Sequence, residues 1–463
     1  MVTGLQGVAG EYSEIIRIAE YVLPHVEQQS IAALSLELLY ADALHEAGRF
    51  KEALIVFEAS LPQLVDLTGY RSRIVFQYRT QIASAIAMSG NYRGGASLYE
   101  GILADQVEHL GDFHPDTLTT RRHIAIINST IGSFNEKEFR SLIADEERIH
   151  GFGDKNTWPT IEALAQTLWK VSRNDEAAVL YRKLLSARAQ ESMSDHPDNL
   201  STRNDYGLTF LREGRAEEAV GWFERLHEDA TRVMGRTHPT TLNIENNWAV
   251  CLLRAGRSKE AIQLFEKVVS KRTSALGLEH PDTLESKHAL ADAFVVDGSP
   301  KPAMKIFEEV IANRARILGH DHPSTLNTCH NIAGLMSAEG RHAEAIDAFV
   351  RLIKNRQMVL GVDHYDTLRA KHDLANAMLR AHRPDAALEL FQALLSRTVR
   401  ALGKDHQLTL RTRYGLANAL QLSLRPAEAK GVRQSVLADQ IRVLGNDHPD
   451  TEQTRLALNL LRQ

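Results

Sequence analysis

The sequence repeats itself at a fixed interval of 42 residues. The phrase LGLEHPDTL at residues 276–284 returns with small changes as LGHDHPSTL, LGVDHYDTL, LGKDHQLTL and LGNDHPDTE. Its histidine recurs at the same interval, at His196, His238, His280, His322, His364, His406 and His448. A fixed period of this length is typical of a chain that stacks one structural unit many times, so it predicts a repetitive array.

Each repeat predicts two helices. The segment TLESKHALADAFVV has apolar residues at helical spacing, and Gly298 follows it where a helix would end. The next segment, PKPAMKIFEEVIANRARIL, predicts a second helix in which Ala303 is followed four residues later by Phe307, a pair that recurs in most repeats. No useful stretch alternates with the period of a β-strand. We therefore expect an all-α fold of antiparallel helix pairs.

The alanine–aromatic spacing and the turn glycine resemble the tetratricopeptide repeat (TPR). The longer period, the LGxDHPxTL link and the extended second helix are similar to the kinesin-light-chain subclass. Similar arrays also occur as C-terminal sensor parts of bacterial and fungal signalling ATPases. The resemblance implies a right-handed α-solenoid of about ten helix pairs with terminal capping helices. It also implies a scaffold or sensor for protein–protein interaction.

The repeat pattern divides the chain into three parts. Residues 1–29 predict an N-terminal helix, residues 30–450 a single TPR array, and residues 451–463 a lone helix that caps the last pair. The first helix aligns with second helices, so the chain begins inside a repeat. Either it was cut from a longer protein with an upstream domain, or this helix is a cap. Some repeats depart from the pattern and are expected to be distorted; Ser172, His382 and Leu424 occupy the glycine slot.

The link histidines are expected to be structural. A catalytic residue is needed once, whereas this histidine returns in almost every repeat. Pro281 suits the first position of a helix, and Asp282 suits the positive end of the helix dipole. Hydrogen bonding at the entry to the first helix therefore explains His280 better than catalysis.

A polar column marks the candidate binding site. The resemblance places the first helices on the concave face, where their second, fifth, sixth and ninth positions, counted from Leu284, would be exposed. With the flanking fourth position, the column contains Asn204, Asn246, Asn247, Lys287, His288, His330, Asn331, Arg369, Lys371, His372, Asn376, Arg411, Tyr414 and Asn418. Asparagine can satisfy both the donor and the acceptor of an extended peptide backbone. The column predicts capture of an extended, acidic peptide, and the alternative is a solvated helix face.

The histidines of this column raise two further expectations. Exposed His288, His330 and His372 would gain charge as the pH falls, so acid should strengthen the binding of an acidic ligand. A metal site is not expected, because packed helices lie about 8–10 Å apart and a Zn–N bond is only about 2.0–2.1 Å long. No cofactor is expected either.

Several classes of function find no support in the sequence. The net charge of −5 is small, and no apolar run is long enough for a membrane span, so neither nucleic acid nor a membrane is an expected partner. Two cysteines without CxxC spacing and no signal peptide predict a cytoplasmic protein. Phosphate-loop, GxSxG and HExxH motifs are absent, so no enzyme is expected. Two alternatives stay open: the C-terminal recognition part of a signalling ATPase, and a TPR-fold enzyme acting on a peptide or natural product.

Overall fold

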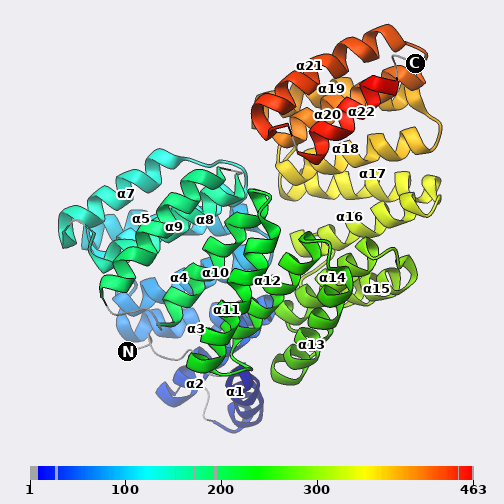
Figure 1. Ribbon diagram of the computed structural model, residues 1–463. Helices are drawn as coiled ribbons and strands as arrows, with labels where there is room; N and C mark the ends of the chain where they lie inside the picture. The colour runs from blue at the N-terminus through cyan, green and yellow to red at the C-terminus, as the bar shows by residue number, and fades with distance from the viewer. Residues whose placement is uncertain are drawn as a thin grey trace. The chain divides into compact units, whose positions relative to one another are not determined.

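The computed structural model describes residues 9–26, 30–151, 153–171, 173–191, 196–446 and 448–460. These residues form twenty-two α-helices and two short 3-10 helices, and they contain no strand (Figure 1). They fold as two compact units, unit 1 (residues 1–322) and unit 2 (residues 323–463). The predicted array 30–450 spans both units. The predictions for Ser172 and for the two ends of the chain, 1–8 and 461–463, fall outside the described residues.

The helices pair as the sequence predicts. The first helices of the ten pairs are α2 (Ile31–Glu46), α4 (Arg73–Met88), α6 (Pro115–Thr130), α8 (Trp158–Lys170), α10 (Pro197–Arg212), α12 (Pro239–Arg254), α14 (Pro281–Val296), α16 (Pro323–Ala338), α18 (Tyr365–Arg380) and α20 (Gln407–Leu422). The second helices are α3 (Phe50–Thr68), α5 (Tyr92–Leu110), α7 (Glu136–His150), α9 (Asn174–Gln190), α11 (Ala216–Met234), α13 (Ser258–Leu276), α15 (Pro300–Ile317), α17 (His342–Val359), α19 (Pro384–Leu402) and α21 (Pro426–Leu444). Before them lie α1 (Ala9–Val22) and η1 (Leu23–His25), η2 (Lys155–Thr157) precedes α8, and α22 (Pro449–Leu460) follows the last pair. The all-α solenoid of about ten pairs is confirmed.

The alanine and aromatic of each second helix form the core. Ala303 and Phe307 of α15 are both fully buried, and the equivalent Phe223, Phe265, Phe349 and Phe391 are buried to the same degree. A small residue one turn before a large one lets the neighbouring helix approach closely and then fills the space beside it. Because interiors pack as tightly as organic crystals, this pair fixes the spacing between helices.

The turn between the two helices of a repeat needs a left-handed backbone. Gly256 and Gly298 hold φ values of 78° there. In the repeats where the sequence departs from glycine, His382 and Leu424 keep the same geometry at φ values of 56° and 58°. The turn is therefore preserved rather than distorted. His382 and Leu424 adopt a strained backbone conformation there, which a glycine would adopt without strain.

The link histidines cap the first helices, as predicted. The Nδ1 atom of His280 accepts a hydrogen bond from the backbone N–H of Asp282 at 3.2 Å, and Pro281 is the first helical residue. The same bond, at 3.1–3.3 Å, is made by His114, His196, His238, His364, His406 and His448. Each bond satisfies a backbone donor that the helix itself leaves unpaired.

Each unit curves with its first helices on the inside. In unit 1, α8, α10, α12 and α14 contact one another across neighbouring repeats, and α16, α18 and α20 do so in unit 2. The second helices of neighbouring repeats contact one another far less in the described part of the chain. Closer spacing on one side of a stack makes that side concave, so the first helices line the inner wall of each unit.

Unit 1 also closes on itself after one turn. Helix α1 packs against α13, far along the sequence (Figure 1). His322 Nε2 donates to the backbone carbonyl of Met88 at 3.1 Å, and His280 forms a hydrogen bond with the backbone of Glu46. The second contact is the first one moved along the chain by one repeat: His322 lies 42 residues after His280, and Met88 lies 42 residues after Glu46. At Gly48 the fit is so close that an added Cβ would lie 2.2 Å from Pro281 Cγ.

Candidate functional site

The predicted column lies on the inner walls, but its members differ in exposure. Lys287, His288 and His330 are buried, and Arg411 is exposed. The others are half-buried: Asn204, Asn246, Asn247, Asn331, Arg369, Lys371, His372, Asn376, Tyr414 and Asn418. The members up to His288 belong to unit 1, and those from His330 onward belong to unit 2.

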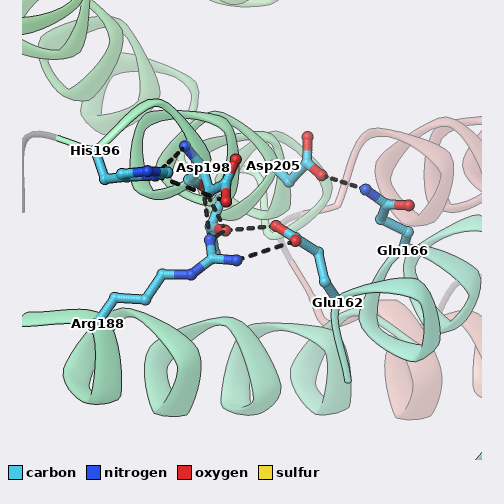
Figure 2. A network of polar contacts seen from close by, with 7 residues as sticks. Glu162, Gln166, Arg188, His196, Asp198 and Asp205 are labelled. Atoms are coloured by element: carbon cyan, nitrogen blue, oxygen red, sulfur yellow. Dashed lines mark hydrogen bonds and ion pairs between the residues drawn. The ribbon is translucent and has the colours of Figure 1, made fainter. Parts of the chain in front are cut away.

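In unit 1, polar side chains join three inner helices by hydrogen bonds. Gln166 Nε2 of α8 donates to Asp205 Oδ2 of α10 at 2.8 Å (Figure 2). Asn204 Nδ2 donates to Asp205 Oδ1 at 3.0 Å, and Asn247 Nδ2 of α12 donates to Asn204 Oδ1 at 2.8 Å. Asn204 and Asn247, two members of the predicted column, thus contact each other, while the contribution of Gln166 was missed. We call these four residues the amide chain.

The fifth-position histidines do not lie open to the groove. His288, His330 and His372 pack edge-on against Phe307, Phe349 and Phe391 of the following helices, with ring centroids 5.2–5.5 Å apart. The predicted exposure is wrong for His288 and His330, each only 8% exposed. The physical reason is the close approach of first and second helices, which draws an imidazole against the core aromatic.

The hydrogen bond from Arg356 determines which ring nitrogen of His330 carries the proton. Arg356 Nη1 donates to His330 Nδ1 at 3.1 Å, so that nitrogen carries no proton. The proton lies on Nε2, which is 2.9 Å from a carboxylate oxygen of Asp373. Burial lowers the pKa of His330 and of His372. A lower pKa works against the gain of charge in mild acid that the sequence predicts for these two rings.

The cations of the column differ in whether an anion already holds them. Lys287 pairs with Glu309, and Arg411 Nε lies 3.0 Å from Asp450. Arg369 and Lys371 of α18, in contrast, make no ion pair with any residue that the structure describes, and the Nε atom of Arg369 is buried without an acceptor. Burial is also the main cause that lowers the pKa of Lys371. Asp373 acts on Arg369 and Asp363 acts on Lys371, but at a longer range than an ion pair.

Sequence reasoning missed a series of buried arginines on the second helices. Arg272 Nη1 donates to the backbone oxygen of Asp282 and to Ser286 Oγ, both at 2.7 Å. Arg356 makes the equivalent bond to Asp366 O at 2.8 Å and a further one to Asn327 at 2.6 Å. Arg188 Nη1 makes the equivalent bond to Asp198 O at 2.6 Å, and its Nη2 donates to Glu162 Oε2 at 3.3 Å (Figure 2). The signal was present, because Arg272, Arg314 and Arg356 recur at 42 residues.

Two further features bear on what the described residues can do. No three of their His, Cys, Asp or Glu side chains gather closely enough to hold a metal ion. None of their helices combines the length and the apolar character that crossing a membrane requires.

A family comparison decides the classification. The model of the tetratricopeptide repeat matches residues 159–232, 240–316, 324–397 and 366–438, which together cover more than half of the chain. The chain belongs to the tetratricopeptide repeat family. The predicted resemblance is thereby confirmed, and the fold is the one that TPR proteins use for protein–protein interaction. No curated protein matches the chain.

Several solved structures are similar to this TPR chain. A variant of a Podosopora anserina protein assigned as a kinesin light chain, with nearly identical TPR-like repeats, shares 29% identity over 44% of this chain and 97% of its own, with a TM-score of 0.40. BtubC (BKLC) from P. vanneervenii shares 17% identity over 50% of this chain and 93% of its own, with a TM-score of 0.36. The Rap protein solved with competence and sporulation factor shares 10% identity over 76% and 99%, with a TM-score of 0.45. The family assignment rests on the sequence match.

Proposed function

We propose that this TPR protein is a scaffold or sensor that binds an extended segment of a partner protein along its inner walls. The observation that carries the proposal is the amide chain of unit 1. An asparagine amide has two N–H donors and an oxygen with two lone pairs. Asn204 uses one of each within the chain, so the remaining donor and acceptor can pair with a peptide backbone. Internal bonds hold these amides in place and so reduce the entropy lost on binding.

We further propose that unit 2 binds a segment with acidic groups, which pair with Arg369 and Lys371. A half-desolvated guanidinium without a carboxylate in direct contact costs free energy that an acidic side chain would recover. Most other arginines of the inner helices already have such a partner; Arg203 lies 2.8 Å from Asp229, and Arg413 lies 2.6 Å from Asp439. The fit to an acidic segment is therefore local to α18.

The test measures the binding of a fluorescent hexaglutamate peptide by anisotropy at low and high salt. The double variant Arg369→Gln, Lys371→Gln should bind about tenfold more weakly, the effect of losing charge-assisted hydrogen bonds. High salt should weaken the wild type and largely erase this difference.

The matched control is Arg400→Gln, Lys404→Gln, which removes two exposed cations of α19 and its following link. Because these residues lie outside the inner wall, the control should bind like the wild type. Equal weakening by both double variants would mean that only net charge matters, and no binding of hexaglutamate would refute the acidic preference.

A further inference from the structure

A cavity of about 170 Å³ opens beside the amide chain in unit 1. Its lining comes from three successive helices: Gln166, Trp169 and Lys170 of α8, Tyr181 of α9, and Asp205 and Leu208 of α10. A volume of this size would hold several water molecules or one medium-sized side chain. It is distinct from the larger hollow of about 490 Å³ on α13, which the side chains of that single helix line.

Two donors at this cavity have no acceptor in the described part of the chain. Trp169 Nε1 is buried without a hydrogen-bond partner. Lys170, an exposed residue at the edge of the cavity, makes neither an ion pair nor a hydrogen bond with any described residue, and desolvation lowers its pKa. A buried indole N–H without an acceptor is energetically unfavourable. The cavity therefore favours a guest that brings an acceptor to these donors.

The acceptors at the same cavity call for a donor. The carboxylate of Asp205 already accepts bonds from Gln166 and Asn204, one on each oxygen, and each oxygen can accept another. Burial raises the pKa of Asp205, with Lys170 opposing that effect. One ammonium and one carboxylate leave the lining without net charge, so a charged guest would meet repulsion from one of them. A neutral guest with both an acceptor and a donor meets neither.

The residues that line this cavity do not recur as a set in the later repeats. Tyr181 stands where Phe223, Phe265, Phe307 and Phe349 stand in later repeats. The pair Trp169 and Lys170 is replaced by Val295 and Val296 three repeats on. A site that is not repeated can recognise one particular side chain, whereas the repeated amides can contact only the backbone that every peptide shares.

We propose that this cavity is a subsite for a primary carboxamide, the side chain of a glutamine or asparagine in the bound segment. The carboxamide oxygen accepts from Trp169 and Lys170, and its NH₂ group donates to Asp205. The inference rests on the proposed function, because it assigns the guest to the segment that the inner walls bind. It adds a sequence preference that the backbone contacts cannot provide.

The test uses N-acetyl-glutamine methylamide and follows the indole N–H signals by NMR. The chain has four tryptophans, so few signals have to be assigned, and Trp169→Phe identifies the relevant one. The probe should move the Trp169 signal in a saturable way at millimolar concentration. The Trp248 signal is an internal control, since its Nε1 is also buried without a partner but does not line the cavity.

Two comparisons establish the chemistry. The matching glutamate and norleucine probes should move the Trp169 signal much less than the glutamine probe does. Lys170→Met should weaken the glutamine probe about tenfold. Arg254→Met, at the equivalent position of α12, should have no effect.

The proposal is overturned if the glutamine probe leaves the Trp169 signal in place, if the three probes act alike, or if Lys170→Met binds as the wild type does. Each of these outcomes would leave the hexaglutamate experiment unchanged, because that experiment reads Arg369 and Lys371 in unit 2. A failed subsite and a failed scaffold function are therefore distinguishable.

Discussion

Leu424 holds a left-handed backbone at the turn before α21, with its side chain almost entirely in solvent. Its φ is 58° and the residue is 90% exposed. A side chain in this region costs about 1–2 kcal/mol relative to the right-handed region. The leucine therefore adds strain without contributing packing.

Leu424→Gly should raise the free energy of unfolding by about 0.5–1 kcal/mol, because the relieved strain exceeds the added freedom of the unfolded chain. Urea unfolding of the whole protein measures the change. Leu422→Gly is the matched control. This leucine is also exposed but lies in a helix, so its replacement by glycine should lower the free energy of unfolding. Equal destabilisation by both variants would contradict the role assigned to the φ value.

His322 makes stability depend on pH. Burial lowers its pKa from 6.5 to about 4. The unfolded chain, with the ordinary pKa, therefore binds more protons between these two values, and stability is lost as the pH falls through 6.5. The hydrogen bond to Met88 O favours the charged ring, but burial is the larger effect.

Between pH 7 and pH 5.5 the wild type should lose about 1 kcal/mol of unfolding free energy through His322. His322→Asn should show a smaller loss over the same range, because asparagine does not titrate. Comparing the two proteins at both pH values cancels the contribution of the remaining titratable groups. Identical pH slopes would mean that His322 is not the group that responds.

At the level of the helices, the aromatic of each second helix carries most of the local packing. Phe307→Ala should cost about 3–5 kcal/mol, because the ring is fully buried and removing it leaves a cavity. Thermal or urea unfolding measures the loss. Glu308→Ala, one residue further along an exposed face, should cost little. A loss below about 1 kcal/mol for Phe307→Ala would show that its ring is not a core element.

The buried arginines join each second helix to the first helix of the next repeat. Arg356→Ala should cost about 3–5 kcal/mol, since it leaves Asp366 O, Asn327 and His330 without their donor. Arg400→Ala on the exposed face of α19 should be nearly neutral. If the two arginines proved equivalent in urea unfolding, the network around Arg356 would be structurally unimportant.

The same arginines show where reading the sequence reached its limit. Helix pairs, turn glycines and histidine caps were predictable, because each depends on neighbours within a few residues, as His280 depends on Asp282. The depth of a polar side chain depends on a different helix. The period placed His330 on the inner side of α16, but only the packing against Phe349 and Arg356 shows that it is buried.

At the level of the whole molecule, unit 1 differs from a simple repeat array, in which each repeat contacts only the adjacent repeats, because unit 1 also closes on itself. Gly48 and Gly256 occupy the same turn at φ values of 74° and 78°, but a Cβ would meet Pro281 only at Gly48. Both alanine variants incur the backbone strain, and Gly48→Ala alone also forces the two turns of the chain apart.

Gly48→Ala should therefore lose more stability than Gly256→Ala and should also exchange amide hydrogens faster around Glu46 and His280. Hydrogen exchange by mass spectrometry measures both regions in one experiment. Gly256→Ala should leave exchange in these two regions unchanged. Equal exchange in the two variants would mean that the contact contributes nothing to holding unit 1 closed.

The contact between Met88 and His322 also has a consequence for synthesis. These residues are separated by 234 positions, whereas most contacts of a repeat array lie within the next repeat. At the usual 5–20 residues per second, a ribosome needs roughly 10–50 s to make the intervening chain. During that time the early helices can pair with each other, but the surface that will meet α13 to α15 has no partner. A chaperone or another nascent chain would find that surface uncovered for the length of this delay.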